Sequence, residues 1–408
     1  MSVYQLVPRP STESPAVLTA SFALDKARQL ATVFAERAEN CEALRRCPSE
    51  SIQDLFDSGL MRMMQPKMFG GSELGMSECL DVVLELAKVC PSTAWVFTNL
   101  ASHSWTIGQL ELQAQQDVWG SDPTALAATG LAFPCGKATY EHGGYRVSGR
   151  WPFASGVDAS TWMIVGCMTD SGDGSAPHRR FFLVPKSDFR SLDNWHAYGL
   201  TGSGSHDVEV VDAFVPEHRT VSAEIFAAGK DLPGGKIHSH PVYSMPTFVS
   251  FAYFLCIVPL GAAKGAIDQF TTSMRHRAST YTGSRVSELS SVQERIAESS
   301  ACVDFAETVM RRDWMELEAL TARGDYPSLE TKLKWKRNVA FASNLIVKSI
   351  DTLMPAAGAA GLSSKLPLQR LFRDVHAASA HIALTWDVQA IAYGQSAMGI
   401  SPQTGLLL

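Results

Sequence analysis

Apolar residues near the start of the chain recur with helical spacing. Five of them, three or four positions apart, would share one helical face: Leu24, Ala27, Leu30, Ala31 and Phe34. Ser49 can cap a second helix, which Gly59 would terminate. Residues 24–119 are therefore predicted to be mostly helical.

The pattern changes to strands between residues 124 and 221. Residues 138–142 and 145–151 flank Gly143 and Gly144, which predicts a hairpin with a two-residue turn. Two apolar runs follow, TWMIVGCM and RFFLVP, and each has the length of a buried strand. This stretch is predicted to be a β domain.

Helical spacing returns from residue 248 to the end of the chain. Four long segments have it: residues 248–280, 286–322, 329–354 and 366–398. Strands never alternate with helices, so a doubly wound sheet is not expected. The fold class is α+β and mostly α, with domains at 1–123, 124–222 and 223–408.

Composition narrows the class of partner. The net charge is −6 and Lys and Arg are scattered singly, which predicts neither nucleic acid nor anionic lipid as a partner. The eight cysteines form no CxxC pair, so we expect reduced thiols in a cytoplasmic protein and no metal. The longest uncharged apolar stretch, residues 248–263, is too short to span a bilayer and contains Pro259. We therefore expect a buried helix there and no membrane partner.

The glycine-rich stretch GLTGSGSHD, residues 199–207, does not have the context of a phosphate loop. Residues 208–215 alternate like a strand, whereas a phosphate loop opens a helix. The chain thus has no recognisable nicotinamide-binding module, and any reducing power must come from another protein.

Four strings together resemble the acyl-CoA dehydrogenase family. They are PKMFGGSELG at 66–75, YRVSGRWPFASG at 145–156, and the segments 198–216 and 355–374. The resemblance implies an N-terminal helical domain, a middle antiparallel β-barrel domain and a C-terminal four-helix bundle.

Within that family, GRWPFASG, GSGSHD and a histidine after the Arg-Asp pair are similar to the two-component flavin-dependent monooxygenases. That similarity implies a reduced flavin, FADH2 or FMNH2, supplied by a separate NAD(P)H:flavin reductase. With O2 the flavin would form a C(4a)-hydroperoxide and hydroxylate a small aromatic molecule of the phenol or indole type.

The distribution of acids supports this branch over dehydrogenation. A dehydrogenase of this fold needs a carboxylate base after the Arg-Asp pair or on the first bundle helix. Glu330 is the last glutamate, residues 248–266 contain no acid, and Asp387 is a lone short candidate. Three alternatives stay open: an acyl-CoA dehydrogenase with a relocated base, an S- or N-oxygenase on the same scaffold, and an inactive scaffold.

The resemblance also assigns residues to the flavin. Ser155 stands where the family has a hydroxyl that contacts flavin N5, and Trp151 and Phe153 would wall the isoalloxazine. Further cofactor contacts are expected from three glycines and three arginines: Gly156, Gly358, Gly361, Arg275, Arg277 and Arg373. Some of these would act across a subunit boundary in a homotetramer or homodimer.

Two histidines complete the predicted catalytic set with Ser155. His381 follows the Arg-Asp pair, on a predicted helix face shared with Ala377, Ala378 and Thr385, and would bond near the flavin C(4a) position. His103 would act as the base toward a phenol or an indole N–H, because imidazole titrates near neutral pH. For both, a purely structural histidine is the competing interpretation. His376 is the other candidate to face the flavin.

Overall fold

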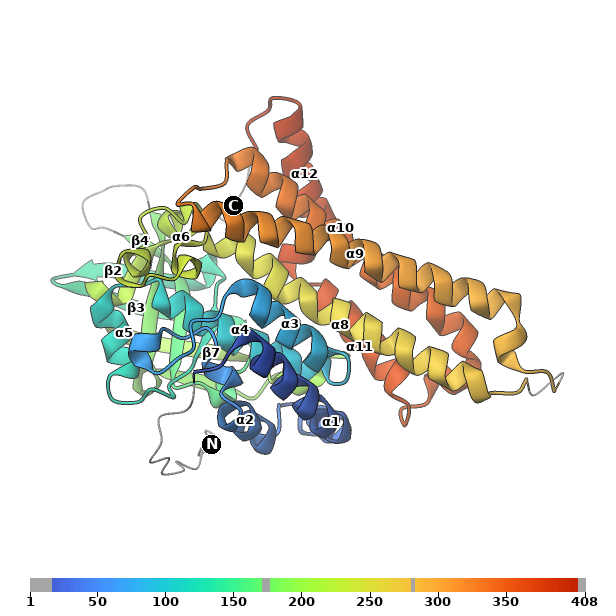
Figure 1. Ribbon diagram of the computed structural model, residues 1–408. Helices are drawn as coiled ribbons and strands as arrows, with labels where there is room; N and C mark the ends of the chain where they lie inside the picture. Colours follow the sequence, from blue (N-terminus) through green and yellow to red (C-terminus); the bar gives the residue numbers. More distant parts are fainter. Residues whose placement is uncertain (1–16, 171–176, 280–282, 403–408) are drawn as a thin grey trace.

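The computed structural model describes residues 17–170, 177–279 and 283–402. Figure 1 shows a sheet at one end, helices of the N-terminal region beside it, and long helices that extend away from both. The N-terminal helices are α1 (Ala20–Leu44), α2 (Ser49–Asp57), α3 (Met76–Ala87), α4 (Pro91–Gly108) and α5 (Leu112–Trp119). The predicted helical start is confirmed.

Local signals set the ends of these helices. The Thr19 side chain accepts the Phe22 N–H and caps α1. Ser49 does not have the capping role that we expected, because it is the first residue of α2 and Pro48 precedes it. Gly59 follows α2 with φ 81°, a left-handed conformation that glycine adopts readily, and it ends the helix as predicted.

The middle region is one mixed sheet. Its strands are β1 (Ala127–Gly130), β2 (Gly136–Glu141), β3 (Gly144–Ala154), β4 (Trp162–Asp170), β5 (His178–Pro185), β6 (Phe189–Leu192), β7 (His206–Pro216) and β8 (Thr220–Ser222). The order is β6-β7-β3-β2-β4-β5-β8, with β1 beside β4. Pairings of β1 and β2 with β4 are parallel and the other five are antiparallel. The expected antiparallel barrel is therefore a largely antiparallel sheet.

The predicted hairpin exists, but its turn lies one residue earlier. Glu141 pairs with Gly144, so the two turn residues are His142 and Gly143. Gly144 belongs to β3, where a Cβ would lie 2.3 Å from the Val215 carbonyl oxygen. The absence of a side chain at Gly144 therefore permits close contact between β3 and β7. The turn itself depends on Gly143, which has φ 84°.

Short helices α6 (Ala223–Ala228) and α7 (Pro233–Ile237) lead from the sheet into the bundle. The bundle contains α8 (Thr247–His276), α9 (Ser290–Ala322), α10 (Leu329–Ala357), α11 (Pro367–Ser379) and α12 (Trp386–Ala397). The single helix predicted for residues 366–398 is wrong, because the chain leaves the helix after Ser379 and forms a 3-10 turn, η11 (Ile382–Leu384).

Helix α8 forms the centre of the core. By length and composition it could cross a membrane, but 89% of its apolar window is buried inside the protein. It packs against α3, α4, α9, α10 and α11, as expected for a core helix of a soluble protein. All eight cysteines lie within the described residues, none forms a disulfide, and all but Cys135 are buried.

Candidate active site

One face of α4 carries the polar groups of the candidate site. Trp95, Asn99 and His103 are spaced by four residues and therefore lie along the same side of the helix. Asn99 is the one residue of α4 that is not fully buried, and its amide donates to the Trp95 carbonyl at 2.7 Å. Eight residues of helix separate Trp95 from His103 by about 12 Å.

His103 lies fully inside the protein and has a defined tautomer. Its Nδ1 is 2.9 Å from the Ala127 carbonyl oxygen, and because a carbonyl can only accept, Nδ1 carries the proton. Nε2 is therefore the acceptor nitrogen, and its lone pair accepts the Thr129 hydroxyl at 3.2 Å. Burial lowers the pKa of His103 to about 4. At neutral pH the site thus contains an uncharged imidazole with a basic nitrogen.

Ser155 lies at the other end of the α4 face. Its hydroxyl accepts the Trp95 indole N–H at 2.9 Å and is 2.7 Å from the Ser205 hydroxyl. Gly156 follows with φ 75°, and a Cβ there would lie 3.1 Å from Leu100. The glycine holds the β3 turn against α4, which fixes the Ser155 hydroxyl beside Trp95.

His381 reaches the same end of α4 from the bundle. Its ring centroid is 6.2 Å from that of Trp95, and its Nδ1 accepts the Ala383 N–H at 3.2 Å. The neutral ring therefore carries its proton on Nε2, as a donor. Surrounding protein lowers the pKa of His381 to about 4, although solvent reaches one side of the ring and limits the shift.

The helical face predicted for His381 is wrong. His381 lies after α11 and caps η11 with its own side chain. Its position is therefore set by that capping bond and by Trp95, and the small residues of a shared helix have no part in it.

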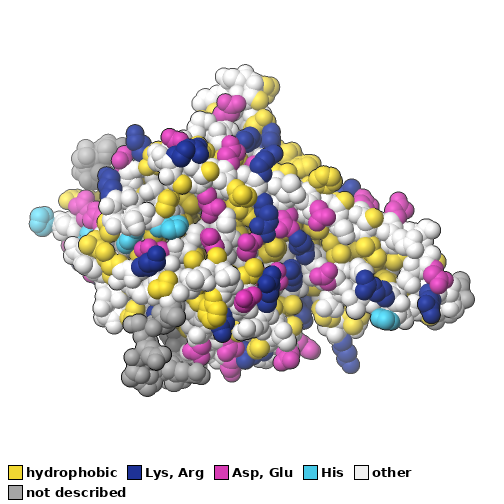
Figure 2. Space-filling model, viewed as in Figure 1, with side chains coloured by type: hydrophobic (Ala, Val, Ile, Leu, Met, Phe, Trp, Pro, Cys, Tyr) yellow, Lys and Arg dark blue, Asp and Glu magenta, His cyan; other side chains and the backbone are white. Residues whose placement is uncertain are grey.

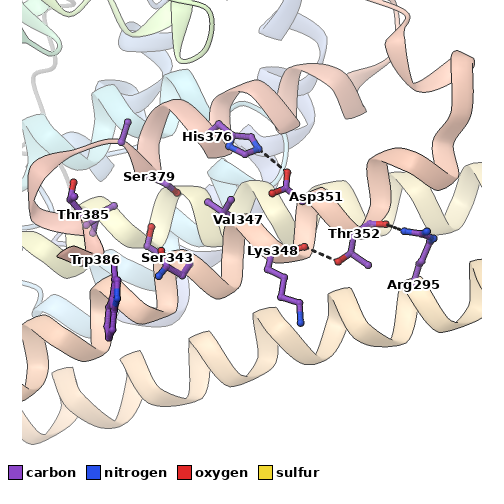
Figure 3. Close-up of a pocket in the computed structure, with 13 residues that line it drawn as sticks. Arg295, Ser343, Val347, Lys348, Asp351, Thr352, His376, Ser379, Thr385 and Trp386 are labelled. Atoms are coloured by element: carbon purple, nitrogen blue, oxygen red, sulfur yellow. Dashed lines mark hydrogen bonds and ion pairs between the residues drawn. The ribbon is translucent and has the colours of Figure 1, made fainter. Parts of the chain in front are cut away.

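His376 points elsewhere. Its Nε2 pairs with Asp351 at 2.9 Å, in a surface groove of about 760 Å³ between α9, α10, α11 and α12. Figure 3 shows this pair between α11 and α10, and Arg295 of α9 beside Thr352 of α10. His381 does not line that groove. His376 therefore faces the groove, whereas His381 faces Trp95.

Two aromatic residues of β3 have opposite environments. Phe153 is 69% exposed and has φ 65°, a strained conformation for a bulky residue. Its ring lies edge-on to Trp195 at 6.3 Å and is open for stacking. Trp151 is fully buried in the sheet core and donates to the Gly166 carbonyl at 2.8 Å. The Trp151 side chain is therefore part of the sheet core, and of the two rings only that of Phe153 is exposed to a ligand.

The predicted arginines and glycines fall into two groups. Arg373 binds the Glu42 carboxylate at 2.6 Å and the Tyr198 carbonyl at 2.7 Å. It therefore joins α11 to α1 and to the residue that precedes the glycine-rich stretch 199–207. Arg277 donates to the Ala357 carbonyl at 2.8 Å, beside Gly358. Arg275 and Gly361 belong to the same two segments. This second group lies at the end of the bundle away from the sheet (Figure 1), separate from Ser155 in the same chain.

Within the described part of the chain, the hydrogen-bond partners of Ser155, His103 and His381 include no carboxylate. Asp387 lies in the first turn of α12, where an acid is favoured by the helix dipole. Within residues 17–170, 177–279 and 283–402, no three His, Cys, Asp or Glu side chains are grouped to hold a metal ion.

Sequence reasoning missed Trp95, Asn99, Thr129 and Ser205. Trp95 and Asn99 precede His103 by eight and four positions, so helical spacing alone could have indicated them. Thr129 and Ser205 come from other elements, β1 and the turn before β7, and no sequence spacing connects them to the site.

Comparisons with known proteins agree with this fold. Residues 22–119 match the acyl-CoA dehydrogenase N-terminal domain and residues 253–386 match the C-terminal domain. The chain is 35% identical to the oxygenase component of p-hydroxyphenylacetate 3-hydroxylase from Acinetobacter baumannii, over 93% of this chain and 89% of that protein.

Two solved structures are also similar. The 3-HSA hydroxylase from a Rhodococcus species superposes with a TM-score of 0.89 at 31% identity and covers 95% of this chain and 98% of its own. XiaF from a Streptomyces species was solved in complex with FADH2 and glycerol. It superposes with a TM-score of 0.87 at 27% identity, over 95% of this chain and 97% of its own.

Proposed function

Because this chain belongs to the flavin-dependent monooxygenases whose oxygenase component has the acyl-CoA dehydrogenase fold, we propose that it hydroxylates a phenol or indole beside α4, where Asn99 is partly exposed. Enzymes of this kind use reduced flavin and O2 and depend on a separate flavin reductase. The relatives act on aromatic compounds such as p-hydroxyphenylacetate. The proposal concerns the substrate class and the roles of the residues.

The observation that carries the proposal is the pair of histidines with opposite hydrogen-bonding roles. The His103 Nε2 is an acceptor that a substrate hydroxyl or N–H would reach by displacing the Thr129 hydroxyl, and the His381 Nε2 offers a proton. Taking a proton from a phenol or an indole makes its ring more nucleophilic. His103 is the base in this proposal, and His381 donates near the reacting oxygen.

Residues near Ser155 fit a flavin ring. The Ser155 hydroxyl can bond N5, the exposed Phe153 ring can stack on the isoalloxazine, and Gly156 permits a close backbone approach. When bound, the reduced flavin would supply two electrons to O2, so that one oxygen atom is transferred to the substrate and the other leaves as water. The neighbouring residues hold the ring, exclude water and orient the substrate.

Arg275, Arg277, Gly358 and Gly361 would contact the flavin of a second subunit, because they lie at the far end of the bundle in their own chain. Exposed apolar side chains along the bundle would be covered in the same assembly: Phe305, Met315, Phe341, Ile391 and Met398. Figure 2 shows apolar and charged side chains interspersed over one face, without a basic stripe. We infer a cytoplasmic homodimer or homotetramer. Light scattering on the purified protein tests the oligomeric state.

The function is tested by rapid mixing of the enzyme and reduced flavin with O2 in the presence of phenols, indoles and thioethers. We expect a hydroxylated phenol or indole, and tighter binding of reduced than of oxidised flavin. His103→Gln should lose product most strongly with substrates of high pKa, whereas Asp387→Asn is the matched control and should retain activity. Bleaching of a tightly bound oxidised flavin by an acyl-CoA would instead support a dehydrogenase, and sulfoxide from the thioethers alone would support an S-oxygenase.

A further inference from the structure

A buried chain of hydroxyl groups lies behind Ser155. Trp95 Nε1 donates to Ser155 Oγ at 2.9 Å, Ser155 Oγ is 2.7 Å from Ser205 Oγ, and Ser205 Oγ is 2.8 Å from Ser203 Oγ. All four residues are buried. Ser205 is close to Ser155 because Gly202 lies against Cys41, where a Cβ would be 2.3 Å from the sulfur. The turn thus holds Ser205 at a fixed place beside the candidate flavin site.

The first bond of this chain has only one possible direction. An indole N–H donates and cannot accept, whereas a serine hydroxyl has one proton and two lone pairs. Trp95 therefore always occupies one lone pair of Ser155. One lone pair and one proton remain on Ser155, to be shared between Ser205 and a group in the pocket.

The two redox states of a flavin require different hydrogen bonds from the remaining lone pair and proton of Ser155. Reduced flavin carries a proton on N5, so Ser155 must accept from N5 and direct its own proton to another acceptor. The Ser205 Oγ, at 2.7 Å, is that acceptor. Oxidised flavin has a lone pair on N5, so Ser155 donates to N5 and needs no acceptor elsewhere.

We propose that Ser205 is a positioning residue that favours reduced flavin, by accepting the Ser155 proton so that Ser155 can accept the N5–H. Ser203 supports it by accepting the Ser205 proton in turn. This inference rests on the proposed function, since it takes Ser155 to be the N5 contact. It adds the group that makes the contact selective for one redox state.

Flavin binding by Ser205→Ala tests the proposal without a measurement of turnover. With reduced flavin the variant leaves the buried Ser155 proton without an acceptor, so its Kd should rise about 5- to 100-fold. With oxidised flavin the Kd should change by less than about threefold, because Ser155 still donates to N5. Anaerobic titration gives the first value and fluorescence titration the second. A tenfold change in their ratio lowers the midpoint potential of bound flavin by about 30 mV.

Three further variants make the result specific. Ser205→Thr keeps the hydroxyl and should restore the wild-type ratio of the two Kd values. Trp95→Phe removes a donor that serves both redox states, so both Kd values should move together. If Ser205→Ala fails to fold, Ser205→Cys keeps the volume but has a weak sulfur acceptor, and it should weaken reduced flavin selectively.

An unchanged ratio of Kd values in every Ser205 variant that folds, with wild-type protein still preferring reduced flavin, overturns this inference and leaves the proposed function intact. Wild-type protein that binds neither flavin form overturns the proposed function, and the inference with it.

Discussion

The neutral state of His103 predicts how stability depends on pH. Its pKa is about 4 in the folded chain, against 6.5 for the exposed group. Between these values the unfolded chain binds a proton that the folded chain does not, so stability is fully present above pH 6.5 and is lost as pH falls toward 4. From pH 7 to pH 5 the loss amounts to about 2 kcal/mol from this residue alone.

His103→Gln is the perturbation that isolates this effect. A glutamine amide can donate to the Ala127 carbonyl and accept from Thr129, as His103 does, but it does not titrate. The variant will lose some stability at pH 7 through imperfect packing. As pH falls to 5, the difference between variant and wild type should move by about 2 kcal/mol in favour of the variant.

The assay is urea unfolding of both proteins at pH 7, 6 and 5, at equal protein concentration. Because other histidines change both curves equally, only the difference between the two proteins is used. An independent measurement is the carbon resonance of labelled His103, assigned by its absence in the variant, which should not titrate between pH 5.5 and 8. A constant difference in stability, or a titration midpoint near 6.5, would refute a buried neutral imidazole and with it the proposed base.

Three other changes give separable results. Phe153→Ala removes the exposed ring and should weaken flavin binding about 3- to 10-fold, while the urea midpoint stays unchanged; flavin titration and unfolding curves check this. His381→Asn keeps a capping acceptor but displaces the N–H donor, and should lower the hydroxylated product per O2 consumed at least about tenfold, as read from product and hydrogen peroxide yields. Burial raises the pKa of Asp374 to about 7 from 3.8, so its folded form loses stability as pH rises from about 4 through 7. Asp374→Asn should therefore gain about 3 kcal/mol relative to wild type between pH 5 and pH 8, and a difference that is flat over this range would contradict it.

The fold was largely accessible from sequence because its elements are long and their apolar periods are regular. The errors occurred where side chains bond to the local backbone. His381 accepts the Ala383 N–H, and Thr385 donates its hydroxyl to the His381 carbonyl at 3.3 Å. Such bonds offer the backbone an alternative to the helix. No apolar period reports them, so a helix was predicted across a break.

The site was accessible only in part, for a different reason. Residues with chemistry of their own, His103 and Ser155, stand out in a sequence. Trp95 and Ser205 act through partners 60 and 50 positions away, and each alone is an ordinary core or turn residue. Which serine receives an indole N–H is decided by the packing of α4 against the end of β3, and that packing is a property of the folded chain.

The protonation pattern of the site is set by the backbone. The Ala127 carbonyl fixes the proton of His103 on Nδ1, and the Ala383 N–H leaves that of His381 on Nε2. Neither tautomer depends on another titratable side chain, and desolvation favours the neutral form of both rings, fully for the buried His103 and in part for the exposed His381. Under the proposed function, a substrate would meet a base and a donor whose roles cannot be exchanged by a shift of one proton between them.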